Sequence, residues 1–466
     1  MEPDERTLTL AGKPLSQNGI LPSPPPILPS PPPGPGGVSH PGCDRAFLFL
    51  QGPHGPFFHQ LGRMLRETGA RVCRVGFNAG DRAFWPDRAS YIPHRASPRE
   101  WPDHLETLIG ERNISDIVLY GDTRPVHAHA IRIARARGLR VHVFEEGYLR
   151  PYWITYERDG ANGNSRLMNI TIDEMRTALE GLPCDMPEAP AHWGDLRQHV
   201  FYGALYHWFV MFLNRGYPGF RPHRRLTVTQ EFRLYLRRLL LMPAHRAERA
   251  FRTRRLIRSG HPYHLVLLQL DHDTSVRDHS PFAGMNDFLE LVVAGFARGA
   301  PRHHHLVFKA HPLESGQVPL RRRIRDLAAR HDVTGRVHYI GGGKLAALLD
   351  HARSAVTINS TAAHQALWRG LPLRAFGKAI YGKNAFTSSQ PLHEFFAAPR
   401  RPDSAAYVDF RRFLLETSQV PGGYYSARGR RQLLRHVVDL MLAADDPYEA
   451  LKNGNAAPRQ QLFAIS

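Results

Sequence analysis

The sequence predicts an α/β protein made of two Rossmann-like lobes with a cleft between them. Short apolar runs alternate with segments of helical periodicity, which is typical of buried parallel strands joined by helices. This alternation occurs twice, and a basic helical stretch separates the two occurrences. Carboxylates, histidines and hydroxyls follow several of the runs. Ligands of open α/β sheets bind beyond the carboxyl ends of the strands, so these side chains mark the expected site.

The first lobe opens with a strand, a glycine-containing turn and a helix. An apolar run at residues 46–50 predicts the strand, and apolar residues recur at helical spacing over residues 57–65 until Gly69 ends the helix. The turn between them carries Gly52 and Gly55. Glycine lets a ligand approach the backbone closely, and a helix N-terminus attracts anions. Both glycines are therefore predicted to contact an anionic ligand.

Three further strands are predicted in the first lobe, at residues 72–77, 117–120 and 141–144. A helix at residues 128–136 precedes the last of them and returns the chain to the sheet. The pattern indicates a doubly wound parallel sheet over residues 44–165.

Two adjacent carboxylates, Glu145 and Glu146, stand where the last of these strands should end, and Gly147 then turns the chain. This position favours an active site, with an acidic surface loop as the alternative. Either glutamate could carry a proton. Glu146 is the preferred candidate because it stands next to the turn.

Residues 170–258 are helical in pattern and basic. Four large apolar residues in this stretch lie at helical spacing: Phe201, Leu205, Phe209 and Phe212. Such a stripe is typical of a core face. Pairs of arginines in the same stretch keep docking on a membrane surface open as the alternative.

A second α/β pattern predicts a second lobe, and two such lobes in succession form the architecture of many nucleotide-sugar transferases. Strands are predicted at residues 264–269, 306–309, 337–340 and 355–359, with helices at 320–330 and 344–353.

Polar side chains follow three strands of the second lobe. Lys309 and His311 suit the phosphate of a nucleotide and proton transfer near neutral pH. Ser360 and Thr361 open a helix, where their hydroxyls can cap the helix and also bind a phosphate. Gln269 ends the first strand of this lobe.

Two carboxylates, Asp271 and Asp273, follow Gln269 and flank a histidine. Their alternating spacing on an irregular segment does not favour a metal site, and neither a metal nor a cofactor is predicted. A carboxylate here that faces Glu145 or Glu146 across the cleft would allow acid/base or nucleophilic work on a glycosidic bond.

The domain boundaries follow from these patterns. Residues 1–43 are rich in Pro, Gly and Ser and are expected to be disordered. The first lobe with its basic helical insertion covers residues 44–258, and the second covers residues 259–428. Residues 429–466 form a C-terminal helical segment, and residues 393–466 are expected to pack back across the lobes.

The composition limits the class of partner and the compartment. The 466 residues carry a formal charge of +19, which favours anionic partners, but no nucleic-acid-binding module is recognisable. The three cysteines lack metal-site spacing and cannot all pair, which fits a reducing cytoplasm. No signal peptide and no membrane-spanning segment is expected, so a soluble or peripheral protein is predicted.

Several motifs, taken as a set, resemble the capsular polysaccharide biosynthesis and export proteins of Gram-negative bacteria. Within this group the chain looks most like the single-module, KpsS-like β-Kdo transferases. The resemblance covers residues 44–430, and the proline-rich N-terminal segment departs from the pattern. The motifs lie at residues 49–58, 77–81, 144–151, 269–273, 279–282, 309–312 and 419–426.

The resemblance implies a GT-B-like, retaining glycosyltransferase that adds β-Kdo from CMP-Kdo to a (lyso)phosphatidylglycerol-linked Kdo primer. It implies a cytoplasmic location on the inner face of the membrane, an anionic glycolipid acceptor, and association with a second Kdo transferase and the capsule export complex. A non-catalytic export or scaffold component is the alternative.

The resemblance also assigns roles to the residues. Glu145 and Glu146 would be the acidic pair and Asp273 the nucleophile, with Asp271 as its rival. His311 would face the CMP phosphate. The remaining predicted donor-binding residues are Gln269, Lys309, Ser360, Thr361, Gly52 and Gly55.

Overall fold

The computed structural model describes residues 42–186, 196–220, 229–230, 233, 241–270, 279–311, 314 and 319–456. Residues His40–Ser466 form one compact unit, and everything below belongs to it. Two predictions lie outside the described residues. One is the disordered N-terminal segment, apart from its last two residues, and the other is the carboxylate pair Asp271 and Asp273.

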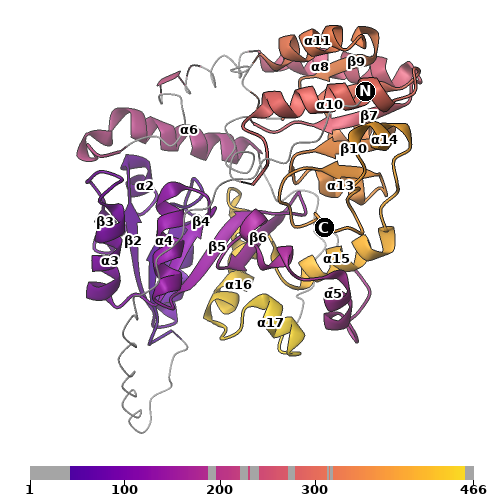
Figure 1. Cartoon of the computed structure of the whole chain (residues 1–466). Coiled ribbons are helices and arrows are strands. Elements are labelled where there is room, and N and C mark those ends of the chain that lie inside the picture. Colours follow the sequence, from indigo (N-terminus) through magenta and orange to yellow (C-terminus); the bar gives the residue numbers. More distant parts are fainter. Residues whose placement is uncertain are drawn as a thin grey trace, which may run out of the picture. The chain divides into compact units, whose positions relative to one another are not determined.

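The first sheet contains the strands predicted for the first lobe and orders them β12-β6-β5-β4-β1-β2-β3. The five strands from β5 to β3 are parallel, as predicted. They are short and largely buried, as expected of parallel strands covered on both faces (Figure 1). Their bounds are β1 (Ala46–Phe49), β2 (Arg71–Gly76), β3 (Tyr91–Pro93), β4 (Asp116–Tyr120) and β5 (Arg140–Glu146).

Four helices connect these strands. In α1 the apolar residues at helical spacing are buried, and Gly69 adopts a positive φ of 87° just beyond the helix end, as the sequence predicts. The helices are α1 (Phe57–Glu67), α2 (Ala79–Ala83), α3 (Trp101–Arg112) and α4 (Pro125–Ala136).

The prediction of a purely parallel first sheet is wrong at one edge. Strand β6 (Trp153–Arg158) returns antiparallel to β5, and β12 (Gln419–Pro421) pairs antiparallel with β6. A βαβ pattern expects a helix after each strand, so the direct return of β6 does not fit it. Strand β12 has three residues, too few to show a period. The boundary predicted at residue 428 therefore places a strand of the first sheet in the second lobe.

A helical segment follows the first sheet, as predicted. Its described helices are α5 (Ile172–Ala178), α6 (Leu196–Phe212) and α8 (Met242–Arg258). The aromatic stripe on α6 is not a core face, because Phe201 is 59% exposed and Phe212 is 58% exposed. Short 3-10 turns, at Asn162–Asn164, Arg166–Met168, Asn214–Gly216 and Thr334–Arg336, complete the connections.

The second sheet has five parallel strands in the order β11-β10-β7-β8-β9, so the two-lobed α/β prediction is confirmed. The strands are β7 (Tyr263–Leu267), β8 (His305–Lys309), β9 (Val337–Ile340), β10 (Ala352–Thr357) and β11 (Leu373–Ala375). The helices are α10 (Met285–Gly299), α11 (Leu320–Arg330), α12 (Leu345–Leu349), α13 (Ala363–Leu367) and α14 (Leu392–Ala397).

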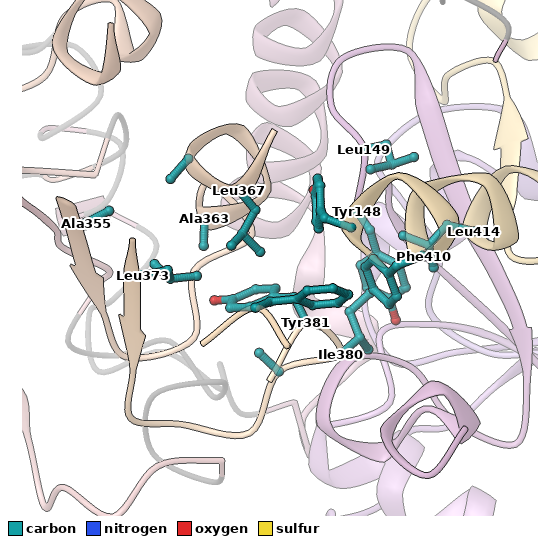
Figure 2. Packing of buried hydrophobic residues seen from close by; sticks show 14 of the residues in the cluster. Tyr148, Leu149, Ala355, Ala363, Leu367, Leu373, Ile380, Tyr381, Phe410 and Leu414 are labelled. Atoms are coloured by element: carbon teal, nitrogen blue, oxygen red, sulfur yellow. The ribbon is translucent and has the colours of Figure 1, made fainter. Parts of the chain in front are cut away.

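The C-terminal helices are α15 (Ser404–Glu416), α16 (Ala427–Leu442) and α17 (Pro447–Lys452). Helix α16 joins the buried cluster of the first sheet, to which its Leu433 and Phe57 of α1 both belong. Helix α15 joins a cluster that contains residues from both sheets. In Figure 2, Tyr148 and Leu149 from the first lobe lie beside Tyr381 and Phe410. The C-terminal segment thus packs against both lobes, as expected.

Candidate active site

A cavity of about 190 Å³ is lined by residues that follow strands of both sheets. Six of the predicted site residues line it: Glu145, Glu146, Gln269, His311, Ser360 and Thr361. They come from the ends of β5, β7, β8 and β10, which are the carboxyl ends of parallel strands. The structure therefore brings together side chains more than 200 positions apart in the chain, taking Glu145 and Thr361 as the extremes.

The two glutamates differ in their surroundings. Glu145 accepts one hydrogen bond at Oε1, from the backbone N–H of Glu146 at 2.9 Å. Burial, together with the charge of Glu146, raises the pKa of Glu145 to about 7. Glu146 accepts hydrogen bonds at Oε1 from the hydroxyls of Tyr120 at 3.3 Å and Tyr425 at 3.4 Å. The raised pKa favours Glu145 as the residue that carries a proton near neutral pH, whereas the position next to the turn had favoured Glu146.

The turn after the glutamates requires glycine at position 147. A Cβ atom on Gly147 would lie 2.1 Å from the carbonyl oxygen of Trp153, which no side chain tolerates. The amide oxygen of Gln419, on β12, accepts the backbone N–H groups of Tyr148 at 2.9 Å and Leu149 at 3.2 Å. The late strand β12 therefore fixes the turn that follows the acidic pair.

Gln269 holds the loop that contains the two hydroxyl residues. Its Nε2 donates to Oδ1 of Asn359 at 2.8 Å, and its Oε1 accepts the backbone N–H of Asn359 at 3.0 Å. Ser360 accepts the N–H of Ala362 at its hydroxyl oxygen, at 3.2 Å, so it stabilises the turn before α13. The prediction that it caps the helix is wrong, because the N-cap of α13 is Ala362 and no side chain caps it. Gln269 thus positions this loop.

Two histidines that the sequence analysis did not select line the cavity with an unsatisfied nitrogen. The Nε2 atoms of His279 and His364 are buried and have no hydrogen-bond partner among the described residues. Burial lowers the pKa of His364 to about 3, so its ring is neutral at neutral pH. A buried polar atom without a partner loses free energy unless a ligand or water satisfies it.

The hydrogen bonds of His364 define what its free nitrogen can do. The hydroxyl of Tyr407 donates to the carbonyl oxygen of His364 at 3.0 Å and lies 3.0 Å from its Nδ1. Because this hydroxyl has one proton, both contacts are hydrogen bonds only when Nδ1 carries the ring proton. Nε2 is then an acceptor and would take a hydroxyl or amino group of a ligand.

The cationic side of the cavity differs from the prediction. Lys309 does not line it. Its side chain is buried, its Nζ donates to the carbonyl oxygen of Ala310 at 3.4 Å, and burial lowers its pKa to about 8. Arg150, Lys378, His279 and His311 line the cavity instead. Arg150 and His279 belong to the motifs recognised in the sequence, whereas nothing in the local sequence marks Lys378.

Gly52 and Gly55 also lie away from the cavity, and the structure gives them a packing role. A Cβ atom on Gly52 would lie 2.5 Å from the ring of Phe58. Gly55 has a φ of +116°, and a Cβ there would lie 3.2 Å from the ring of Tyr202 on α6. The two glycines let the loop after β1 pack closely.

The motif around Asp81 also serves to hold α6. The side-chain amide of Asn78 donates to the hydroxyl of Tyr206 at 2.7 Å, and this hydroxyl lies 3.3 Å from Oδ1 of Asp81. A Cβ on Gly80 would lie 2.6 Å from the ring of Tyr206. Helix α6 therefore sits over the end of the first sheet and brings His199 close enough for Glu146 to affect its pKa.

No group of three His, Cys, Asp or Glu side chains is placed to hold a metal ion within the described ranges. Asp271 and Asp273, the rival candidates for the nucleophile, lie outside these ranges. No helix in the part of the chain that the structure describes is long and apolar enough to cross a membrane.

Comparison with known proteins shows the family. Residues 115–425 match the model of the family described as capsule polysaccharide biosynthesis protein. The chain belongs to this family. It is 33% identical over 382 residues to the capsule polysaccharide export protein KpsS of Escherichia coli, covering 82% of this chain and 97% of that protein. It is 31% identical over 383 residues to the capsule polysaccharide modification protein LipB of Neisseria meningitidis, covering 81% of this chain and 91% of that protein.

Among solved structures, the chain is similar to the β-Kdo 2,7 transferase of Thermosulfurimonas dismutans KpsC. The identity is 13%, the TM-score is 0.41, and the match covers 85% of this chain and 100% of that one. A likeness at this level carries no argument about activity. The family resemblance drawn from the motifs is nonetheless confirmed by the family model and the curated relatives.

Proposed function

We propose that this protein is a retaining glycosyltransferase that adds β-Kdo from CMP-Kdo to a (lyso)phosphatidylglycerol-linked Kdo primer in capsule biosynthesis. The observation that carries the proposal is the cavity in which Glu145 and Glu146 share one space with His311, Ser360 and Thr361. It combines carboxylates with groups that bind phosphate, as the transfer of a sugar from an anionic nucleotide requires.

In this reaction the bond between the anomeric carbon of Kdo and the CMP phosphate oxygen breaks, and CMP leaves with the bonding electrons. The positive charge of Lys378 and a hydrogen bond from His311 stabilise the departing phosphate. A new bond forms from the anomeric carbon to a hydroxyl oxygen of the acceptor. The proton of that hydroxyl passes to Glu145, whose pKa of about 7 suits a base at neutral pH.

Retention of configuration requires two displacements: a carboxylate oxygen bonds to the anomeric carbon from the face opposite to the departing CMP, and the acceptor oxygen then displaces that carboxylate from the face that CMP left. We assign this task to Asp273, with Asp271 as the rival candidate. The protein acts on the inner face of the cytoplasmic membrane, where the lipid acceptor lies, next to a second Kdo transferase and the capsule export complex.

The test is incubation of the purified full-length chain with CMP-Kdo and a lipid-linked Kdo acceptor, with the product followed by mass spectrometry. We expect transfer by the wild type, and loss of transfer with retained folding for Glu145→Gln, Glu146→Gln, His311→Ala and Asp273→Asn. Absence of both sugar transfer and CMP binding in the wild type would refute the proposal. Wild-type turnover by Asp273→Asn would remove that residue as the nucleophile.

A second candidate function is a non-catalytic component of capsule export. The Escherichia coli relative, which is named an export protein, favours it. The same incubation separates the two, because an export component would leave CMP-Kdo unconsumed.

A further inference from the structure

A second cavity, of about 280 Å³, lies between the first turns of α6 and α16. Its lining includes Arg197 and Phe201 on α6, and Tyr425, Ala427 and Arg430 at the start of α16. None of its described lining residues lines the cavity that holds the acidic pair. It is therefore a separate space, which the roles assigned so far do not use.

One side chain connects the two cavities. Tyr425 lines the second cavity, and its hydroxyl donates to Oε1 of Glu146 at 3.4 Å. The ring of His199 stacks on Tyr425 with a centroid distance of 4.2 Å and an interplanar angle of 4°. A ligand in the second cavity would therefore lie one tyrosine ring away from the acidic pair.

The second cavity is cationic. Arg430 is 6% exposed, and its Nε and Nη1 bind Oε1 of Gln60 and the carbonyl oxygens of Tyr424 and Tyr425. Its Nη2 has no hydrogen bond to the described residues. Arg197, which is exposed, adds a second positive charge, and none of the described lining residues is acidic. A buried cation without a carboxylate beside it favours an anionic ligand.

The same cavity opens onto apolar surface. Phe201 lines it and is 59% exposed, and the exposed residues Trp208 and Phe212 follow on the same helix, with exposed Leu213 just beyond its end. Several large apolar side chains exposed next to one another mark an interaction site. A single exposed apolar side chain is normal, whereas a contiguous apolar patch is rarely left in contact with water. The ligand that fits both features carries one anionic group and an apolar chain.

We propose that this second cavity binds the acceptor: its anionic group lies between Arg197 and Arg430, and its apolar part lies along Phe201 and the exposed side of α6. The inference rests on the proposed transferase function, and it adds where the acceptor enters and what is recognised. The anionic group is either a phosphodiester or a sugar carboxylate, which share the chemistry that the arginines recognise.

The test is binding of soluble probes to the full-length protein, measured by isothermal titration calorimetry. Dihexanoyl phosphatidylglycerol supplies the phosphodiester, and a hexyl glycoside of Kdo supplies the carboxylate. Dihexanoyl phosphatidylcholine is the probe with no net charge. We expect saturable binding of at least one anionic probe, and at least about tenfold weaker binding of the phosphatidylcholine.

The variants avoid the structural contacts of Arg430. Arg197→Gln removes the exposed charge, and Ala427→Phe fills the cavity. Both variants are expected to bind the anionic probe about tenfold or more weakly and to leave CMP binding unchanged. Arg435→Gln is the matched control, because Arg435 is an exposed arginine on the same helix that does not line the cavity.

The proposal is overturned by lack of saturable binding of both anionic probes, by wild-type binding in Ala427→Phe, or by equal affinity for phosphatidylcholine. Probe binding tests the acceptor site and CMP binding tests the transferase function, so one can fail without the other. Loss of CMP binding with retained probe binding removes the transferase function and leaves the cavity as an anionic lipid site. CMP binding without probe binding removes the acceptor site alone.

Discussion

Gln269 holds Asn359 through both ends of its amide, donating to its side chain at 2.8 Å and accepting its backbone N–H at 3.0 Å. Both residues are buried at the cavity wall. The side-chain Nδ2 of Asn359 also donates to the carbonyl oxygen of His279 at 3.4 Å. The hydroxyls of Ser360 and Thr361 therefore take their position from Gln269, which itself follows β7.

Gln269→Ala should both weaken CMP binding and lower stability. Loss of two buried hydrogen bonds costs on the order of 1–3 kcal/mol of unfolding free energy. Release of the 359–361 loop should lower the affinity for CMP about tenfold, because a phosphate site on a mobile loop must be ordered before it can bind. Calorimetric titration with CMP and a thermal melt provide the two readouts, with Gln432→Ala on α16 as the control. Unchanged affinity for CMP would show that the loop does not bind the donor.

Glu145 should set the pH dependence of transfer. Its pKa of about 7 means that the deprotonated form, which a base requires, appears as the pH rises through 7. The wild-type rate should therefore rise between pH 6 and pH 8. Glu145→Gln should reduce the rate about a hundredfold or more and leave the residual rate without this rise. A pH profile of kcat measured with saturating CMP-Kdo checks it, and a rise that persists in the variant would assign the proton to another group.

The same carboxyl gives a stability readout that does not depend on activity. Its pKa in the folded protein lies above its ordinary value, so its contribution to folding is present at low pH and is lost as the pH rises through about 7. Glu145→Gln removes that loss and should raise Tm more at pH 8 than at pH 5. Glu180→Gln, at an exposed position of the chain, is the control and should shift Tm equally at both pH values.

The sequence predicts the parts of this site that depend on local pattern. Apolar runs locate the strands, and the residues after them, such as Glu145, His311 and Ser360, reach the cavity because carboxyl ends of parallel strands share an edge. The same reasoning predicted that Lys309 would reach the cavity, but Lys309 does not line it. As the last residue of β8 its side chain is buried, and only His311, two residues further along, reaches the cavity. A run of apolar residues does not tell where the strand stops.

Other parts depend on contacts between distant segments and leave no local trace. Tyr425 reaches Glu146 from nearly 280 positions away, and Gln419 fixes the turn after it from a strand of three residues. His364 lies within a short helix whose pattern is that of any buried helix, and its exposure to the cavity follows from tertiary packing. The stripe on α6 has the helical spacing of a core face and is nonetheless exposed. Spacing shows which residues share a face of the helix, but it does not show whether another element covers that face.

A group of histidines at the amino ends of the second sheet should make the protein acid-sensitive. Burial lowers the pKa of His264 to about 3 and that of His304 and His305 to about 4. Their rings are neutral in contacts such as that between Nδ1 of His305 and Nε2 of His338 at 2.8 Å. Because these pKa values lie below the ordinary 6.5, the stability they contribute is complete above that pH and is lost as the pH falls towards 4.

The expected result is a fall in Tm between pH 7 and pH 5, which His305→Asn should reduce. The unfolding free energy attributable to one such ring changes by on the order of 1–2 kcal/mol over this range. Thermal melts at the two pH values measure it, with His351→Asn, an exposed histidine, as the control. An equal acid shift in both variants would place the sensitivity elsewhere.

His364 should recognise a donor group of the bound ligand through its Nε2 atom. The ring is neutral, Tyr407 holds the proton on Nδ1, and Nε2 is buried without a partner at the cavity wall. His364→Phe keeps the shape of the ring and removes the acceptor, so it should weaken CMP-Kdo about tenfold. Tyr407→Phe leaves Nε2 of His364 in place but no longer fixes the ring proton on Nδ1, so a smaller loss of CMP-Kdo affinity is expected. Titration of both variants with CMP and with CMP-Kdo shows whether the nitrogen meets the nucleotide or the sugar, because a loss confined to CMP-Kdo places it at the sugar. Wild-type affinity of His364→Phe for both ligands would leave the nitrogen without a role in binding.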